Sequence, residues 1–108
     1  MISAGEASGD IYGAYLAEKL IQLNPGVRLS GVGGAKMKEK GVEILEDPTA
    51  LSAVGFTEAL ANLSFHRKVF ARAARELDRI SPDCLVLIDF PEFNMRLAKR
   101  AARQNIPG

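Results

Sequence analysis

The 108-residue sequence has no tryptophan, and it contains only one cysteine and one histidine. A single cysteine excludes an internal disulfide and fits a protein kept in a reducing compartment. So few thiols and imidazoles form no cluster with the spacing of a metal site. No apolar run reaches the roughly 18 residues of a membrane-spanning helix, and no basic segment followed by an apolar stretch opens the chain. These absences predict a cytosolic protein without a bound metal.

The sequence also lacks an excess of charge of either sign. Its formal net charge of +1 gives no reason to expect a nucleic-acid partner. Its length fits about one domain with a single core. Residues 1–4 are short for a buried first strand, which usually spans about five residues. Residues 104–108 read as a helix end followed by the start of another strand. We therefore expect a fragment of a longer protein.

Between its ends the chain alternates strand and helix patterns. Helical apolar spacing covers 11–23, and Asn24, Pro25 and Gly26 stop it. The continuous apolar run 84–88 is typical of a strand buried on both faces of a parallel sheet, which makes Cys84 a core residue. The alternation predicts an α/β fold with a Rossmann-like, doubly wound parallel sheet. Helices are expected over 11–23, before Gly41, and over 49–62, 64–80 and 93–103, and further strands over 27–32 and 42–45.

Ligands bind such sheets outside the carboxyl ends of the strands, where three loops are expected: 5–10, 31–36 and 89–94. The first loop, GEASGD, fails as a dinucleotide loop because its glycines are spaced by four and no acid ends the second strand. It fails as a Walker loop because no Gly-Lys-Ser/Thr follows Gly5. Ser8 or Asp10 could cap the following helix. Glu6 lies too early for a cap there, so it could bind substrate hydroxyls or orient a neighbouring loop.

Asp89 directly follows the apolar strand 84–88. A carboxylate at that edge of the sheet should be partly desolvated, which suits it to act as a general base. The alternative is a helix cap for the segment that starts near Phe93, a task that Glu92 or Asn94 could also perform. The Asn94 amide could otherwise contact a sugar or a phosphate.

Four stretches of the sequence together resemble the N-terminal part of lipid A disaccharide synthase. They are ISAGEASGD, GVGG with the following KM and Gly41, AVGFTEAL, and PD followed by IDFPEFN. The resemblance implies an inverting glycosyltransferase with two Rossmann-like domains (GT-B). Residues 1–108 would form the acceptor-side domain, truncated, with the donor-binding C-terminal domain absent. The reaction would transfer a 2,3-diacylglucosamine from UDP to 2,3-diacylglucosamine 1-phosphate, releasing UDP.

The resemblance also implies roles for individual residues. Asp89 matches the acid that would take the proton from the acceptor hydroxyl. Asn94 would support the acceptor pocket, and neither a metal nor another cofactor is implied. The acidic glycine loop would line the cleft between the domains through Glu6, Ser8, Gly9 and Asp10.

Residues 53–72 combine apolar side chains with the cations that follow His66. This pattern is typical of a helix that binds to the surface of an anionic bilayer. The matching part of the family suggests peripheral attachment to the inner face of the inner membrane. Thr57 and Ala59 are milder than expected there, and packing on the sheet is the alternative. His66 itself is expected on a solvated helix face, and the basic residues 96–103 on a solvated flank. The membrane-facing candidates are Val54, Phe56, Leu60 and Leu63.

Two other functions fit the same pattern of residues. One is a different nucleotide-sugar glycosyltransferase of the same architecture, with its acids placed for another acceptor. The other is a non-enzymatic Rossmann-like binding module. Finding an acylated acceptor in the cleft would separate these possibilities.

Overall fold

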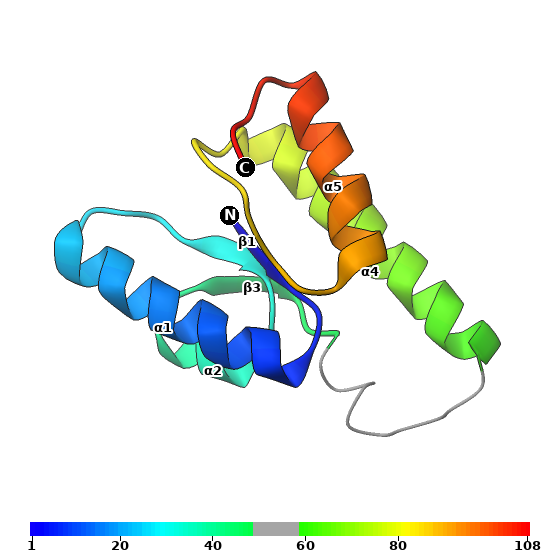
Figure 1. Ribbon diagram of the computed structural model, residues 1–108, viewed down its shortest axis with the longest axis horizontal. Coiled ribbons are helices and arrows are strands. Elements are labelled where there is room, and N and C mark those ends of the chain that lie inside the picture. Colours follow the sequence, from blue (N-terminus) through cyan, green and yellow to red (C-terminus); the bar gives the residue numbers. More distant parts are fainter. Residues whose placement is uncertain (49–58) are drawn as a thin grey trace.

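The computed structural model describes residues 1–48 and 59–108. Four short strands alternate with four helices over these residues (Figure 1). The strands are β1 (Ile2–Ala4), β2 (Ser30–Val32), β3 (Glu43–Glu46) and β4 (Val86–Ile88). The helices are α1 (Ala7–Leu23), α2 (Ala35–Glu39), α4 (Ala59–Ile80) and α5 (Pro91–Arg103).

The strands form a parallel sheet in the order β3-β2-β1-β4. β1 is therefore central: Ile2 lies opposite Gly31 of β2 on one side and Val86 of β4 on the other. The chain runs outward from β1 through β2 to β3, and then returns to place β4 on the opposite side of β1. This reversal makes the space beyond β1 and β4 the topological switch point of the sheet. The predicted α/β, doubly wound parallel fold is confirmed.

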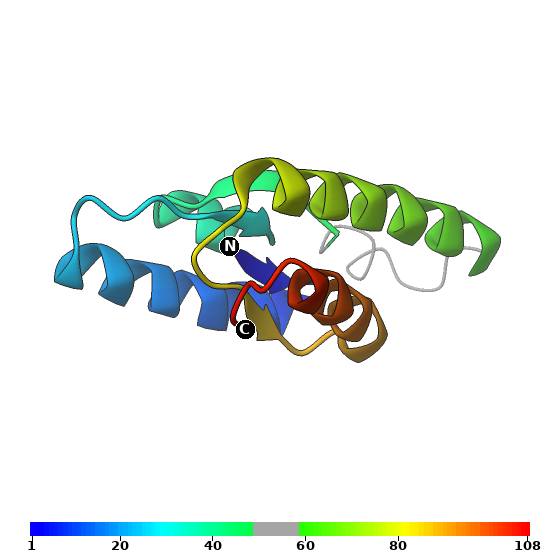
Figure 2. The same cartoon turned by 90° about the horizontal axis from the view of Figure 1, so that it is seen from above.

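Helices cover both faces of the sheet, α1 with α2 on one and α4 with α5 on the other (Figures 1 and 2). Alternate side chains of each strand point to opposite faces, so the sheet contributes to two separate cores. Ile2 and Ala4 pack with Met37 on the α1 side, while Val32 packs with Leu77 and Leu97 on the α4 side. Each helix pair thus has its own apolar contact with the sheet.

Helix α1 packs through small residues rather than through its large apolar ones. Its buried positions include Gly9, Gly13, Ala14 and Ala17, whereas Tyr15 is 62% exposed. A Cβ at Gly13 would lie 2.6 Å from the sulfur of the buried Met37. The missing side chain therefore lets α1 and α2 approach each other closely. Five larger apolar residues gave the helical spacing in the sequence. Leu16 and Leu20 are half-buried, whereas Ile11, Tyr15 and Leu23 are exposed.

Two sequence predictions about the second half are wrong in detail. Strand β4 is not buried on both faces: it forms an edge of the sheet over the described residues, and its three residues are half-buried. Cys84 is exposed rather than part of the core, and the strand begins only at Val86. In addition, α4 runs from Ala59 to Ile80 without the expected break near residue 63.

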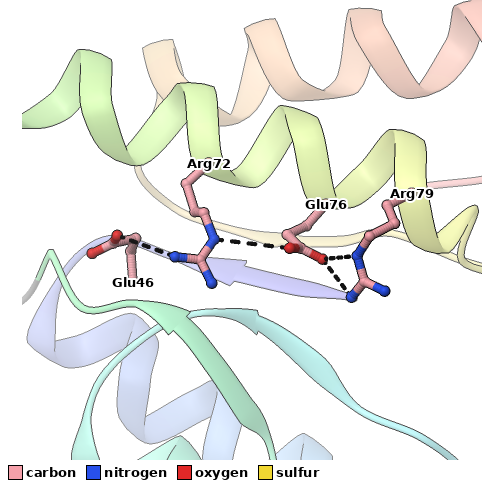
Figure 3. Close-up of polar contacts among 4 residues, drawn as sticks. All are labelled: Glu46, Arg72, Glu76 and Arg79. Atoms are coloured by element: carbon pink, nitrogen blue, oxygen red, sulfur yellow. Dashed lines mark hydrogen bonds and ion pairs between the residues drawn. The ribbon is translucent and has the colours of Figure 1, made fainter.

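Ion pairs hold α4 against its neighbours. Arg72 pairs with Glu46 of β3 at 3.7 Å and with Glu76 at 3.9 Å, and Glu76 also pairs with Arg79 at 2.7 Å (Figure 3). The arginines are largely exposed and the glutamates partly exposed, so each pair contributes only about 0–1 kcal/mol. The Arg72–Glu46 pair links α4 to β3, and the other two pairs lie within α4.

A second ion pair joins α4 to α5. Arg100 donates to Asp78 at 2.6 Å, and Gln104 donates to the same carboxylate. The hydrogen bond from Arg100 is the main reason why the pKa of Asp78 lies below its ordinary value.

The predicted solvated flank of α5 is confirmed, since the basic residues of this helix are all exposed: Arg96, Lys99, Arg100 and Arg103.

Candidate functional site

The loops that follow β1 and β4 meet at the switch point of the sheet. Ala4 ends β1 and lies opposite Ile88, which ends β4. Helix α1 begins three residues after Ala4, and α5 begins three residues after Ile88. Two helix N-termini, each with unpaired backbone N–H groups and a partial positive charge, therefore face the same edge. Glu6 and Asp89, the acids predicted from the sequence to face each other, belong to these two neighbouring loops.

The first loop is shorter than the sequence indicated. Helix α1 starts at Ala7, so Ser8, Gly9 and Asp10 belong to its first turns. Glu6 occupies the N-cap position, although its side chain makes no capping hydrogen bond. The prediction that Glu6 lies too early for this position is wrong. Glu6 and Ser8 are exposed at the edge of the sheet, whereas Gly9 is buried.

Asp10 caps a helix, but not the one that contains it. Its Oδ1 accepts hydrogen bonds from the amides of Gly34 (2.8 Å) and Met37 (3.0 Å), and its Oδ2 accepts one from Lys36 (3.0 Å). Those amides form the N-terminus of α2, whose own N-cap residue is a glycine. The Asp10 side chain is 5% exposed. Both oxygens of this carboxylate are therefore engaged inside the fold rather than free to bind a sugar.

Asp89 lies in an unusual turn directly after β4. Asp89 (φ 50°) and Phe90 (φ 51°) are both left-handed, a conformation that costs an ordinary residue about 1–2 kcal/mol. Pro91 then opens α5 at a position where a missing N–H costs nothing. Asp89 is exposed, so the expected partial desolvation is not found in this chain. Two consecutive strained residues at the edge of a sheet indicate a turn that its surroundings hold in place.

One such support is a buried polar pair formed by Ser3 and Asn94. The Asn94 amide donates to the backbone oxygens of Asp89 (2.6 Å), Ile88 (3.3 Å) and Ser3 (3.2 Å). Its Oδ1 accepts a hydrogen bond from the Ser3 hydroxyl at 2.6 Å. Asn94 is 4% exposed, and these bonds use its amide inside the protein. Asn94 therefore holds the backbone of the turn from inside the protein, and its side chain is not directed toward a ligand.

The second support is the close contact between the two loops. The ring of Phe90 lies directly against Gly5, where an added Cβ would come within 2.1 Å of it. Any larger residue at position 5 would displace this ring. Phe90 also stacks on Phe93 with a centroid distance of 4.8 Å. The glycine after β1 thus leaves room for the aromatic residue after β4.

A third contact comes from α4. His66 meets the Phe90 ring edge-to-face, with centroids 5.3 Å apart and planes inclined by 83°. Its side chain is half-buried, so the expectation of a solvated His66 is wrong. The reason is that α4 packs beside α5 (Figure 1). This packing brings the His66 ring into contact with Phe90 of the turn.

Comparison with known proteins agrees with this arrangement. The family model for lipid-A-disaccharide synthetase matches residues 1–108. Lipid-A-disaccharide synthase of Koribacter versatilis is 45% identical over 99% of this chain, and that of Geobacter sulfurreducens is 42% identical over 98%. The enzyme of Syntrophus aciditrophicus is 38% identical over 99% of the chain. The chain belongs to the lipid-A-disaccharide synthetase family. It spans 28% of the length of each of these three relatives.

Membership of the lipid-A-disaccharide synthetase family confirms the resemblance drawn from the four sequence motifs. Two of those motifs end in the loops that meet at the switch point, and a third provides the α2 N-terminus that Asp10 caps. The fourth, residues 53–60, lies mostly outside the described residues. So do the membrane-facing candidates Val54 and Phe56, and the side chains of Leu60 and Leu63.

Sequence reasoning missed three residues that form or support the turn at the switch point: Ser3, Phe90 and His66. A serine in the middle of a short buried strand is a usable signal, since a buried hydroxyl needs a partner. Phe90 and His66 gave no such signal, because their contact joins elements that are distant in sequence. No helix in the described part of the chain is long and apolar enough to cross a membrane. Over the same residues, no three His, Cys, Asp or Glu side chains gather as metal ligands would.

Proposed function

We propose that the protein carrying this chain is an inverting glycosyltransferase that makes the lipid A disaccharide. It transfers 2,3-diacylglucosamine from a UDP donor to 2,3-diacylglucosamine 1-phosphate and releases UDP. The family membership and the names of the relatives support a lipid A glycosyltransferase. Within this chain, the observation that carries the proposal is the exposed Asp89, held in a strained turn at the switch point.

Asp89 is the general base in this proposal. Its carboxylate takes the proton from the acceptor's primary hydroxyl as that oxygen attacks the anomeric carbon. The new carbon–oxygen bond forms while the bond from the anomeric carbon to the UDP oxygen breaks, and UDP leaves with the electron pair. One base is sufficient for direct displacement, because no covalent intermediate has to be hydrolysed. The exposed position of Asp89 leaves its carboxylate accessible to an acceptor sugar.

The facing loop forms the acceptor side of the site in this proposal. Glu6 and Ser8 are exposed beside the first amides of α1, so they can accept and donate hydrogen bonds to sugar hydroxyls. Gly9 contributes close packing, since a Cβ there would lie 3.1 Å from that of Ala4. Asp10 and Asn94 act from inside the fold, as cap and as support.

Replacing Asp89 by Asn in the full-length protein tests the base. The amide has nearly the same size but cannot take a proton, so kcat should fall by about 10²–10⁴-fold while the fold stays intact. UDP release with both lipid sugars present measures the rate, and circular dichroism checks the fold. Glu92→Gln is the matched control, because Glu92 is an exposed acid in the first turn of the same helix. A near-normal rate for Asp89→Asn would exclude the general-base role.

The proposal also places the protein at the cytoplasmic face of the inner membrane as a peripheral protein. Both substrates carry acyl chains, so the enzyme must reach a lipid surface. The exposed Arg67 and Lys68 of α4 offer positive charge to anionic headgroups. Apolar anchoring is assigned to the candidates between Val54 and Leu63.

A further inference from the structure

The turn that presents Asp89 needs support from outside its own sequence. Asp89 and Phe90 are both left-handed. Aspartate is among the few non-glycine residues that adopt this conformation locally, whereas a bulky residue such as Phe90 rarely does. The Ser3–Asn94 pair holds the backbone oxygens on the β4 side, through Ile88 and Asp89. The Phe90 backbone oxygen accepts a hydrogen bond from the Asn94 backbone N–H, while the Phe90 side chain is held by what packs against its ring.

Phe90 packs on the apolar core of the α4 side, and three further contacts to its ring come from described residues. Gly5 lies directly against it, Phe93 stacks on it, and His66 meets it edge-to-face. Gly5 offers no side chain, and Phe93 belongs to the same helix as the turn. His66 is the member of this group that comes from α4, which also packs on β3 through a different face. It links the turn to a helix other than the one that the turn opens.

We propose that His66 is a positioning residue, which holds Phe90 and through it the left-handed backbone that presents Asp89. His66 acts through ring packing and takes no proton from the substrate. The expected effect of His66 on catalysis rests on the proposed function, in which Asp89 is the general base. The contact between His66 and the turn is given by the ring geometry and does not depend on that function.

The structure of the turn provides a readout that is independent of activity. The backbone N–H of Asn94 donates a hydrogen bond to the Phe90 carbonyl oxygen at 2.9 Å. Hydrogen exchange at this backbone amide therefore reports whether Phe90 keeps its place. An edge-to-face aromatic pair changes an equilibrium by roughly two- to tenfold. His66→Ala should therefore speed exchange at the Asn94 amide by about that factor, measured by NMR on this chain. The phenylalanine variant, His66→Phe, keeps an aromatic edge without imidazole chemistry and should restore slow exchange.

Activity of the full-length protein gives the second measurement. With His66→Ala, kcat should fall by about two- to tenfold at an unchanged KM. The acceptor still binds, but Asp89 is correctly placed for a smaller fraction of the time. The His66→Phe variant should recover kcat, whereas a role in proton transfer would leave it as slow as His66→Ala. Arg75→Ala, an exposed change elsewhere on α4, serves as the control.

The outcomes separate the two proposals. Unchanged exchange at Asn94 in His66→Ala would overturn the positioning role, whatever the enzyme does. Faster exchange that His66→Phe restores would support it even if the wild-type protein released no UDP, which would refute the proposed function alone. Failure of His66→Phe to restore slow exchange would also contradict support by ring packing.

Discussion

Replacing Asp10 should unfold the N-terminus of α2 rather than weaken substrate binding. Asp10 accepts three backbone hydrogen bonds there, two of them from the buried Gly34 and Met37 and one from the exposed Lys36. In Asp10→Ala, water can reach the Lys36 amide but not the other two. Each buried amide left without a partner costs about 1–3 kcal/mol, so with two of them the free energy of unfolding should fall by about 2–6 kcal/mol.

Asp10→Asn makes a milder change at the same place. Its side-chain oxygen can still accept from Gly34 and Met37, but its NH₂ group then faces the Lys36 amide, and the negative charge at the helix N-terminus is lost. We expect a loss of about 1–2 kcal/mol, the usual range for a damaged helix cap. This variant remains informative even if Asp10→Ala is too unstable to purify.

Urea denaturation followed by circular dichroism measures both variants. The midpoint should fall while the slope m stays unchanged, because the same surface is exposed on unfolding. Glu39→Gln is the control: it removes an exposed carboxylate from α2 without touching the cap, and should change stability by less than about 0.5 kcal/mol. A loss below about 1 kcal/mol for Asp10→Ala would refute the assignment of Asp10 as a buried cap.

Two further predictions concern the contact between the loops and the proposed membrane surface. Gly5→Ala should lower the free energy of unfolding by about 1–3 kcal/mol, since its Cβ would overlap the Phe90 ring. In the double variant with Phe90→Ala the two losses should not add, and simple additivity in urea denaturation would contradict the contact. Replacing Arg67 and Lys68 by Ala should reduce sedimentation of the full-length protein with anionic vesicles and leave neutral vesicles unaffected. If the wild-type protein and this double variant bound equally to anionic vesicles, Arg67 and Lys68 would have no part in membrane binding.

The alternation of elements was readable from the sequence because each element carries its own local signal. Asn24, Pro25 and Gly26 mark the end of α1, and the apolar residues before Asp89 mark β4. The placement of Asp89 and Glu6 at one edge followed from the parallel topology alone. These predictions needed only periodicity, turn residues and the rule that parallel strands end at the same side of a sheet.

The details that were wrong depend on contacts between distant segments. Asp10 looked like a local cap, but its partners lie 24 to 27 residues away. Cys84 looked buried because it adjoins an apolar run, yet the strand itself starts two residues later. His66 has no apolar neighbour pattern of its own, and its burial comes from the crossing of α4 over the turn. Such contacts are set by tertiary packing and leave no trace at short sequence range.

The Ser3–Asn94 pair has a consequence for how the protein acquires its site. The two residues are separated by 91 positions, and β1 can pair with β4 only after residues up to Ile88 have been synthesised. Contacts over such separations carry a large loop-closure cost and slow the folding reaction. The first half of the sheet, β1 to β3, can form from residues that lie within the first 46. The turn that presents Asp89 is therefore expected to assemble after the first half of this sheet.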